Sequence, residues 1–336
     1  MKETRLFNKL MLSQCPLSNF DFSYLKSEKL LLDILEQSNI YMIVQRPVLY
    51  LQNLYVDHSN CKRPLMKFQI KQKGTENTLQ CEFPFRQQAL GNTESEKILF
   101  HFCVDYEFQQ AKQSDPPFNH IINMLIYTQE DGYGNWFSPE KLLFDFWNER
   151  IELEIKGDIQ GFLNYNVHYI GKATEEHVIK RLTGHEHLQD VLSTEMPFQY
   201  GGLPTDEIVL LFFEFSDNIH LAMLEDDDLT EELFEQMKSG NLPTVPEKAI
   251  YHDAEKALIH AFNPKHNKVI YKHYPNGKQN LFEHNDLKAY TYSFLDPITL
   301  IFNEKSIMGS RDFFDTDMLL VKHGEPLTIL KASERN

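Results

Sequence analysis

The chain has 336 residues, more than the roughly 100–200 residues of a typical domain, so we expect two domains or one domain with large additions. Its hydrophobic content of 42% and charged content of 24% are ordinary for a globular protein and exclude a chain dominated by disorder. The first residues lack the apolar stretch of a signal peptide, and no apolar run approaches the ~18 residues of a membrane span. We therefore expect a cytoplasmic protein that makes no membrane contact.

The net charge of −16 weighs against simple phosphate binding, because affinity for nucleic acids depends largely on lysine and arginine. The acidity is local, however, since sixteen acidic residues and three lysines lie between residues 190 and 256, centred on 225–235. A nucleic-acid partner is therefore not excluded. The acidic run is typical of a solvated helix face. The alternative is a mimic of nucleic acid that shields a site or binds a basic partner.

The four cysteines are widely spaced and form no C-x-x-C pair, so they indicate neither a zinc site nor a disulfide framework. We expect buried free thiols, since unpaired cysteine is among the most buried residue types. The four are Cys15, Cys61, Cys81 and Cys103.

Residues 1–148 are predicted to form a β-rich recognition or regulatory domain of sandwich or barrel type. Short β-prone runs alternate with turns rich in Gly, Asn and Pro. Near the end of this segment, Ser138 followed by Pro139 predicts the start of a short helix, because serine caps helix N-termini and proline fits the first turn. The β-prone runs are residues 40–44, 65–70, 98–104 and 121–127.

Residues 149–275 are predicted to form an α/β domain with a small antiparallel sheet flanked by helices. The alternation at 151–155 is typical of a half-buried strand, which we expect to pair with 167–170 as a hairpin. The almost continuous apolar run at 208–213 predicts a third strand, buried on both faces. The expected helices are residues 175–192 and 254–262, and an acidic insertion spans about 217–250.

Residues 276–336 return to β patterning, around 299–302 and 318–321, and form the C-terminal extension. The predicted fold class is therefore α+β. It combines a β-rich N-terminal domain, an α/β domain with a small sheet, and a β-patterned tail.

The motif with the clearest chemistry is Tyr169-Ile170-Gly171, at the end of an apolar run. Arg181 and His185 follow four residues apart on a predicted helix and share one face. A phenol beside two cationic groups suits a phosphodiester, whose cleavage needs activated water and positive charge near the developing phosphorane. Glu255, on the predicted helix at 254–262, supplies a carboxylate for a metal.

This order resembles the GIY-YIG nuclease superfamily, whose members carry Arg on a helix after the Tyr-Ile-Gly strand and a metal-binding Glu on a later helix. The helix of Glu255 ends in a Pro-containing loop with Asn267, which is similar to the family. The resemblance spans roughly residues 152–271. It rests on an ordered set of features: Tyr169-Ile170-Gly171, Arg181, His185, Glu255 and Asn267.

The resemblance implies a role for each of these residues. Tyr169 would orient or activate the attacking water, and Arg181 would clamp a nonbridging phosphate oxygen. Glu255 would hold one Mg²⁺ or Mn²⁺ ion together with waters and substrate oxygens. The other assignments are His185 and Asn267 as catalytic residues and Lys172 as a contact of the substrate phosphate. The competing interpretations are a packing role for Tyr169, a solvated charge for Arg181 and a loop cap for Asn267.

The first signature triplet departs from the family pattern. A Gly-Ile-Tyr is expected about ten residues before Tyr169, but the chain there reads Lys156-Gly157-Asp158-Ile159-Gln160. Tyr165 is the nearest phenol, and it belongs to the same strand or to its turn.

Two functions follow from these observations. The first is a metal-dependent endonuclease that favours DNA over RNA, with restriction or phage defence as its setting. The second is a non-catalytic module for binding or assembly, with a protein partner or in a homo-oligomer. The missing first tyrosine and the acidic segment favour the second function.

Overall fold

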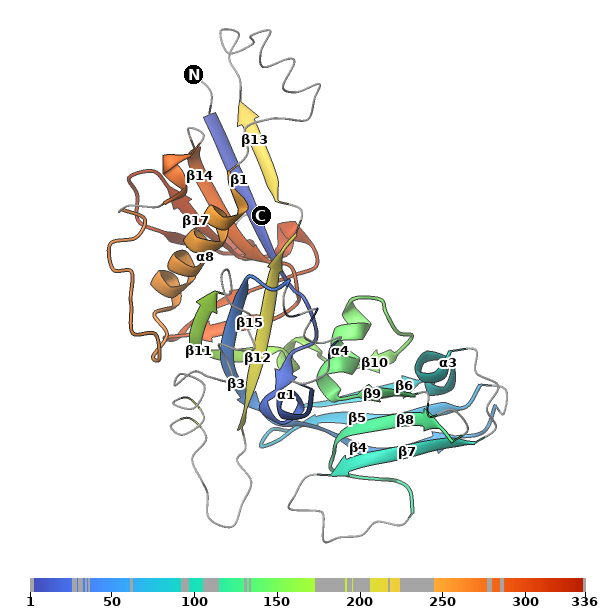
Figure 1. The fold of residues 1–336 in the computed structure, drawn as a ribbon. Helices are drawn as coiled ribbons and strands as arrows, with labels where there is room; N and C mark the ends of the chain where they lie inside the picture. The colour runs from blue at the N-terminus through green and yellow to red at the C-terminus, as the bar shows by residue number, and fades with distance from the viewer. Residues whose placement is uncertain are drawn as a thin grey trace.

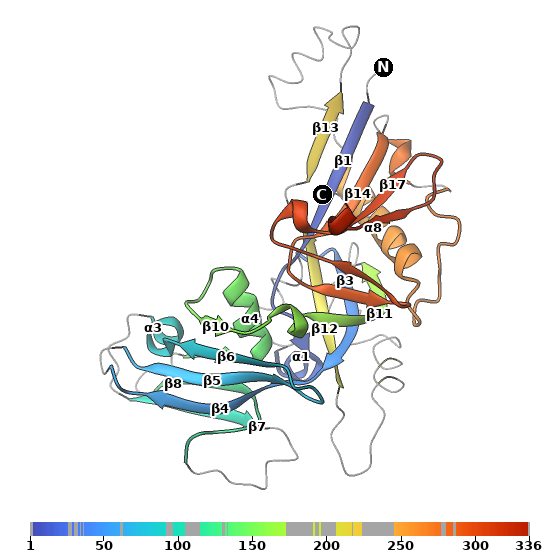
Figure 2. The same cartoon turned by 180° about the vertical axis from the view of Figure 1, so that it is seen from behind.

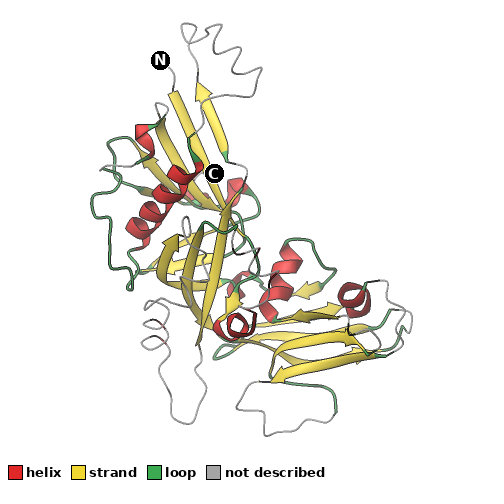
Figure 3. Cartoon of the chain, in the orientation of Figure 1, coloured by secondary structure: helices red, strands yellow, loops and turns green. Residues whose placement is uncertain are grey.

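The computed structural model describes residues 3–25, 29, 33, 35, 37–60, 63–91, 97–104, 115–129, 132, 134–172, 191, 195, 206–216, 218–223, 245–276, 280–284 and 287–334. Two β-sheets form most of this part of the chain, and the helices lie beside them (Figure 3). No helix within these residues has both the length and the apolar character of a membrane span.

The smaller sheet has seven strands in the described chain and is antiparallel throughout. It lies beside the lower end of the larger sheet in Figure 1. The strand order is β10-β6-β5-β4-β8-β7, and β9 also pairs with β8. The strands are β4 (Leu49–Asp57), β5 (Leu65–Gln72), β6 (Thr78–Phe83), β7 (Ile98–Val104), β8 (Ile121–Thr128), β9 (Gly134–Phe137) and β10 (Glu154–Lys156).

The larger sheet has eleven described strands and is mixed, because β1 pairs in parallel with β14 and β11 in parallel with β15. The order is β16-β15-β11-β3-β12-β1-β14-β17-β18, with β13 also beside β1 and β2 beside β12. Seen from behind, β1, β14 and β17 form its upper part, and β3 and β11 its lower part (Figure 2). The strands are β1 (Glu3–Leu12), β2 (Leu17–Ser18), β3 (Ile40–Pro47), β11 (Asn164–Lys172), β12 (Asp206–Phe215), β13 (Ile219–Met223), β14 (Leu287–Phe294), β15 (Thr299–Phe302), β16 (Lys305–Met308), β17 (Met318–Lys322) and β18 (Thr328–Leu330).

The sheets do not follow the boundaries expected at residues 148 and 275. β1 and β3, from the first segment, pair with β12 from the second, and β1 also pairs with β14 from the third. The described chain is a strand-rich mixture of α and β structure, in line with the predicted class. The division into three consecutive domains stays a prediction.

The predicted hairpin between residues 151–155 and 167–170 is wrong. β10 pairs with β6 in the seven-stranded sheet, whereas β11 pairs with β3 and β15 in the other sheet. The alternation of apolar residues identifies a strand and its buried face, but it does not identify a partner from a distant part of the chain.

The predicted burial of the strand at residues 208–213 is confirmed, and the structure shows its neighbours in the sheet. Residues 208–213 of β12 are all buried. β12 lies between β3 and β1, so β3 separates it from β11. A strand with neighbours on both edges and cover on both faces needs apolar side chains in both directions, which explains the continuous run.

Two of the described helices were predicted from the sequence. Ser138 caps α4, accepting a hydrogen bond from Lys141 N at 3.3 Å, and Pro139 is the first helical residue, as predicted. α8 covers the predicted helix at 254–262 but begins earlier, directly after Pro246. The described helices are α1 (Asn19–Leu25), α3 (Phe85–Leu90), α4 (Pro139–Trp147) and α8 (Glu247–Phe262), with short 3-10 turns η2 (Gln160–Phe162), η4 (Leu281–Glu283), η5 (Phe313–Asp315) and η6 (Ala332–Glu334).

The thiols follow the prediction in part. Cys15 and Cys81 are buried, and Cys103 is half-buried. Cys61 lies outside the described residues.

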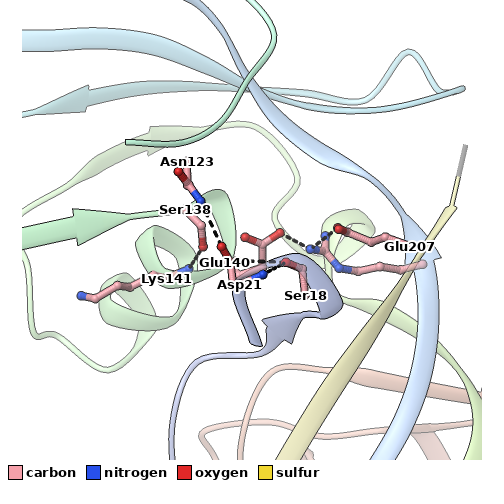
Figure 4. A network of polar contacts seen from close by, with 8 residues as sticks. Ser18, Asp21, Asn123, Ser138, Glu140, Lys141 and Glu207 are labelled. Carbon is pink, nitrogen blue, oxygen red and sulfur yellow. Dashed lines mark hydrogen bonds and ion pairs between the residues drawn. The ribbon is translucent and has the colours of Figure 1, made fainter. Parts of the chain in front are cut away.

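A buried arginine joins helix α4 to the larger sheet. Arg46 of β3 is fully buried, and its Nη2 donates to Glu140 of α4 and, at 3.0 Å, to Glu207 of β12. Its guanidinium also lies 5.8 Å from the ring centre of Tyr165 on β11. Figure 4 shows this network, in which Glu140 and Glu207 both bind the guanidinium and Asp21 lies beside Glu140. One cation therefore links α4 to three strands of the larger sheet.

We predict that Arg46→Met strongly destabilises the fold, because it leaves Glu140 as a buried carboxylate without its cation. Breaking a buried ion pair costs about 3–5 kcal/mol of unfolding free energy, which urea denaturation would measure. Arg63→Met is the matched control, since Arg63 pairs with Glu152 at a site where the two side chains are 49% and 60% exposed. That change should cost less than about 1 kcal/mol. Similar losses in both variants would contradict the bridging role of Arg46.

A second buried charge ties the end of β1 to α4. Asp296 is fully buried and accepts from Leu12 N at 2.5 Å and from Trp147 Nε1 at 3.1 Å. Burial raises the pKa of Asp296 from 3.8 to about 6, although both hydrogen bonds oppose the shift. A carboxyl group with a raised folded-state pKa contributes stability below about pH 4 and loses it as the pH rises through about 6.

We therefore predict that Asp296→Asn removes part of the pH dependence of stability. Relative to this variant, the wild-type protein should lose on the order of 2–3 kcal/mol of unfolding free energy between pH 4 and pH 7. Urea unfolding of both proteins across that range measures the difference. A difference that stays constant with pH would show that Asp296 does not titrate in this way.

Candidate functional site

Tyr169 lies on β11, whose antiparallel partner is β3. In this register Gly171 is opposite Tyr41, and Tyr169 is opposite Ile43. Alternate residues of paired strands share a face, so Tyr41 and Tyr169 are diagonal neighbours. Their ring centres are 5.9 Å apart, with 35° between the ring planes. Two phenols that are far apart in the sequence therefore lie side by side.

Gly171 allows the Tyr41 ring to approach the backbone of β11. A Cβ atom at Gly171 would lie 2.5 Å from Cζ of Tyr41 and 2.6 Å from its hydroxyl oxygen. Tyr41 is only 3% exposed, so its ring is closely surrounded. The Tyr41 phenol on the neighbouring strand thus explains why a glycine, with no side chain, is needed at the end of the Tyr-Ile-Gly triplet.

α8 brings a carboxylate to the end of β11. Lys172 Nζ lies 3.0 Å from Oε2 of Glu255 and 2.5 Å from Nδ1 of His252. His252 and Glu255 are three residues apart and so share a helix face. The Lys172 and Glu255 side chains are 22% and 14% exposed, which leaves this ion pair mostly shielded from water.

A third phenol, Tyr271, follows α8 and belongs to the same group. Burial raises the pKa of Tyr271, and Glu255 and Tyr169 raise it further. Such electrostatic effects act over short distances, so Tyr271 lies near both Glu255 and Tyr169.

Asp253 points away from this group, as its spacing from Glu255 predicts. It is fully buried, and its Oδ2 accepts from Tyr274 at 2.7 Å and from Tyr292 of β14 at 2.8 Å. Burial raises the pKa of Asp253, and these hydrogen bonds oppose the shift. Asp253 therefore fixes α8 against β14 and so sets where Glu255 stands.

The side-chain amide of Asn267 binds the main chain of β11. Its Oδ1 accepts from Ile170 N at 3.0 Å, and its Nδ2 donates to Ile170 O at 2.8 Å. The neighbouring His266 N donates to His168 O at 3.1 Å. β15 pairs with β11 only at residues 164–166, so the loop after α8 takes the place of a strand along the rest of that edge.

Next to this edge, His168, Glu195 and His266 form a cluster that no sequence pattern predicted. One potential ligand atom from each lies within 4.8 Å of the others. Burial lowers the pKa of His168. Burial also acts to raise the pKa of Glu195, but hydrogen bonds from Lys265 and His266 outweigh it and lower the value to about 2.

The structure brings together Tyr169, Lys172 and Glu255, three of the predicted site residues. Arg181 and His185, together with most of the predicted helix at 175–192, lie outside the described residues, as does most of the acidic insertion. Tyr41 and His252 were not predicted, because neither stands at a spacing that connects it to Tyr169. The local sequence that could have indicated Tyr41 is Asn39-Ile40-Tyr41, which differs from Gly-Ile-Tyr at one residue.

No model of a protein family matches the chain, no curated protein is similar to it, and no solved structure matches its fold.

The donor set around Glu255 fits a hard divalent cation in part. Mg²⁺ binds oxygen atoms and often takes only one or two protein carboxylates, keeping waters for its remaining positions. Glu255 offers one such carboxylate. Within the described residues, it belongs to no group of three His, Cys, Asp or Glu side chains that could enclose an ion.

We predict that Gly171→Ala displaces the Tyr41 ring. A methyl group at 2.5 Å from the ring forces side chains or backbone to shift, which typically costs about 1–3 kcal/mol. Near-ultraviolet circular dichroism should change as well, since the environment of the tyrosine changes. Gly161→Ala is the control, because its Cβ would meet its nearest atom, Nδ2 of Asn77, at an ordinary 3.5 Å. An unchanged spectrum and stability for Gly171→Ala would rule out the close contact.

Proposed function

We propose that the protein is a metal-dependent endonuclease that hydrolyses phosphodiester bonds, with DNA favoured over RNA. In this proposal β3, β11, β12 and α8 form a GIY-YIG-like unit. The observation that carries it is the Tyr41 phenol, which lies against Gly171 and beside Tyr169. The adjacent ion pair between Lys172 and Glu255 supplies charged groups at the same place.

Asn39-Ile40-Tyr41 then takes the part of the first triplet, instead of residues 156–160. The resemblance requires that triplet on the partner strand of Tyr169, and β3 is that partner. Residues 156–160 do not meet the requirement, because β10 pairs with β6. Residues 48–163, which include the seven-stranded sheet, become an insertion between the two triplets. This insertion accounts for the absence of a tyrosine at the expected spacing.

The side chains divide the chemistry between them. Tyr169 or Tyr41 orients the attacking water or takes its proton, which requires a pKa below the ordinary phenol value of ~10 during the reaction. Once the Lys172 ammonium leaves Glu255, it neutralises negative charge on the phosphate. Glu255 would hold a Mg²⁺ or Mn²⁺ ion, which polarises the phosphoryl group.

The remaining predicted residues keep distinct roles. From the segment after β11, Arg181 is proposed to bind a nonbridging phosphate oxygen, and His185 to donate a proton to the oxygen that leaves when the P–O bond breaks. Asn267 acts as a positioning residue, because both polar atoms of its amide hold the main chain of Ile170.

The second candidate is a non-catalytic module for binding or assembly. The observation that favours it is the shielded ion pair, in which Lys172 already neutralises Glu255. A metal ion must compete with this ammonium for the carboxylate.

We predict that the protein nicks supercoiled plasmid DNA only when Mg²⁺ or Mn²⁺ is present. Tyr41→Phe, Arg181→Ala and Glu255→Gln should each reduce the rate by about 100-fold or more, the range in which proton transfer and charge stabilisation contribute. Agarose-gel assays with purified full-length protein measure the rate.

Tyr55→Phe is the control for the tyrosine change, because Tyr55 lies on β4 of the other sheet and is 42% exposed. It should cut as well as the wild type, and circular dichroism should show that every variant is folded. Metal-dependent cutting that persists in Tyr41→Phe would remove Tyr41 from the site. A folded wild type that cuts with neither ion would favour the binding module.

A further inference from the structure

The cluster of His168, Glu195 and His266 combines three separate segments of the chain. His168 belongs to β11, and His266 lies in the loop after α8. Glu195 lies in the stretch between β11 and β12. The ligand atoms are all within 4.8 Å of one another. No local pattern in the sequence links these residues, so only the fold brings them together.

The cluster is partly enclosed and already in contact. Nε2 of His266 lies 2.9 Å from Oε1 of Glu195, and these side chains are only 12% and 15% exposed. The two imidazole rings are arranged edge to face, with centres 6.2 Å apart. Ligands of a four-coordinate ion stand about 2.0–2.2 Å from the metal, so small rotations of these side chains would close the set.

The chemistry of the set selects the kind of ion. Two imidazoles and one carboxylate are typical ligands of Zn²⁺ and of related first-row transition ions. Mg²⁺ prefers oxygen ligands and does not match two histidines. The ion expected here therefore differs from the one proposed at Glu255, which is not a member of this group.

The surrounding contacts hold the ligands in place. Gln45 Nε2 donates to the main-chain oxygen of Glu195 at 2.8 Å, and Gln45 Oε1 lies 2.9 Å from Nε2 of His168. His266 N donates to His168 O at 3.1 Å. Outer contacts of this kind orient metal ligands and strengthen binding. An ion would bind His168 through Nδ1, or through Nε2 in place of the contact with Gln45.

Lys265 is a cation that opposes a metal at this cluster. Its Nζ lies 2.5 Å from Oε1 of Glu195, but its side chain is 68% exposed. A lysine on the surface can turn into water with little loss of packing, so an incoming divalent ion can replace it beside the carboxylate.

We propose that His168, Glu195 and His266 bind one Zn²⁺ ion, with the fourth position filled by water. The ion connects the Glu195 segment to β11 and to the loop that carries Asn267. Since it binds the folded chain through three distant segments, it stabilises the fold in proportion to the logarithm of its concentration over its dissociation constant.

The test is zinc binding by full-length protein that has been stripped of metal with a chelator. Titration against a chromophoric zinc indicator should give one tight site per chain, and Co²⁺ should produce the visible absorption of a four-coordinate site. His168→Gln, Glu195→Gln and His266→Gln should each weaken zinc binding by more than ~10-fold. Zinc should raise the melting temperature of the wild type but not of these variants.

Two control variants distinguish zinc at this cluster from zinc bound elsewhere on the chain. His284→Gln, directly after η4, removes a histidine outside the cluster and should bind zinc as the wild type does. Glu255→Gln should also retain zinc, whatever it does to DNA cleavage. Circular dichroism without metal identifies variants that fail to fold, and Glu195→Gln, which keeps the side-chain shape, then decides the result. The proposal is overturned if the wild type binds no stoichiometric zinc, or if the folded cluster variants bind it equally well.

Discussion

The buried guanidinium of Arg46 is the interaction that holds α4 against the larger sheet. It joins Glu140, on the helix that leaves the seven-stranded sheet, to Glu207 of β12. Such a contact is costly to form, because Nε and Nη1 of Arg46 are buried without a hydrogen-bond partner among the described residues. Its geometry is nevertheless defined, since one guanidinium on β3 binds a carboxylate of α4 and a carboxylate of β12. The neighbouring Tyr165 extends the contact to β11, the strand that also carries Tyr169 of the candidate site.

The sequence is informative wherever a structure is determined by near neighbours. Ser138 and Pro139 define the start of α4, and the apolar run in β12 reports burial on both faces, because capping and alternation act over a few residues. The pairing of β11 is different. Its pairing with β3 depends on contacts between residues that are far apart in the sequence. The alternation of apolar and polar residues in β11 would allow any strand of similar polarity to be the partner. For this reason the hairpin with residues 151–155 was a reasonable inference from local pattern and still wrong.

The candidate site shows the same division. Tyr169, Lys172 and Glu255 could be found because the order of a motif along the chain survives any insertion placed before it. Tyr41 could not be found by spacing, because the sequence between its strand and the strand of Tyr169 contains all seven strands of the smaller sheet. The histidines of the second cluster have no motif at all. In the sequence, His168 and His266 are only the residues next to Tyr169 and Asn267. They lie near Glu195 because the loop after α8 runs along the edge of β11.

β3 ends at Pro47 and β4 begins at Leu49, so a single residue, Val48, separates the strand that carries Tyr41 from the inserted sheet. The chain therefore passes directly from one sheet into the other. A tilt of the seven-stranded sheet would therefore pull on β3, the strand that carries Tyr41. A partner that binds the seven-stranded sheet and tilts it would thus act on the strand that places Tyr41 beside Tyr169.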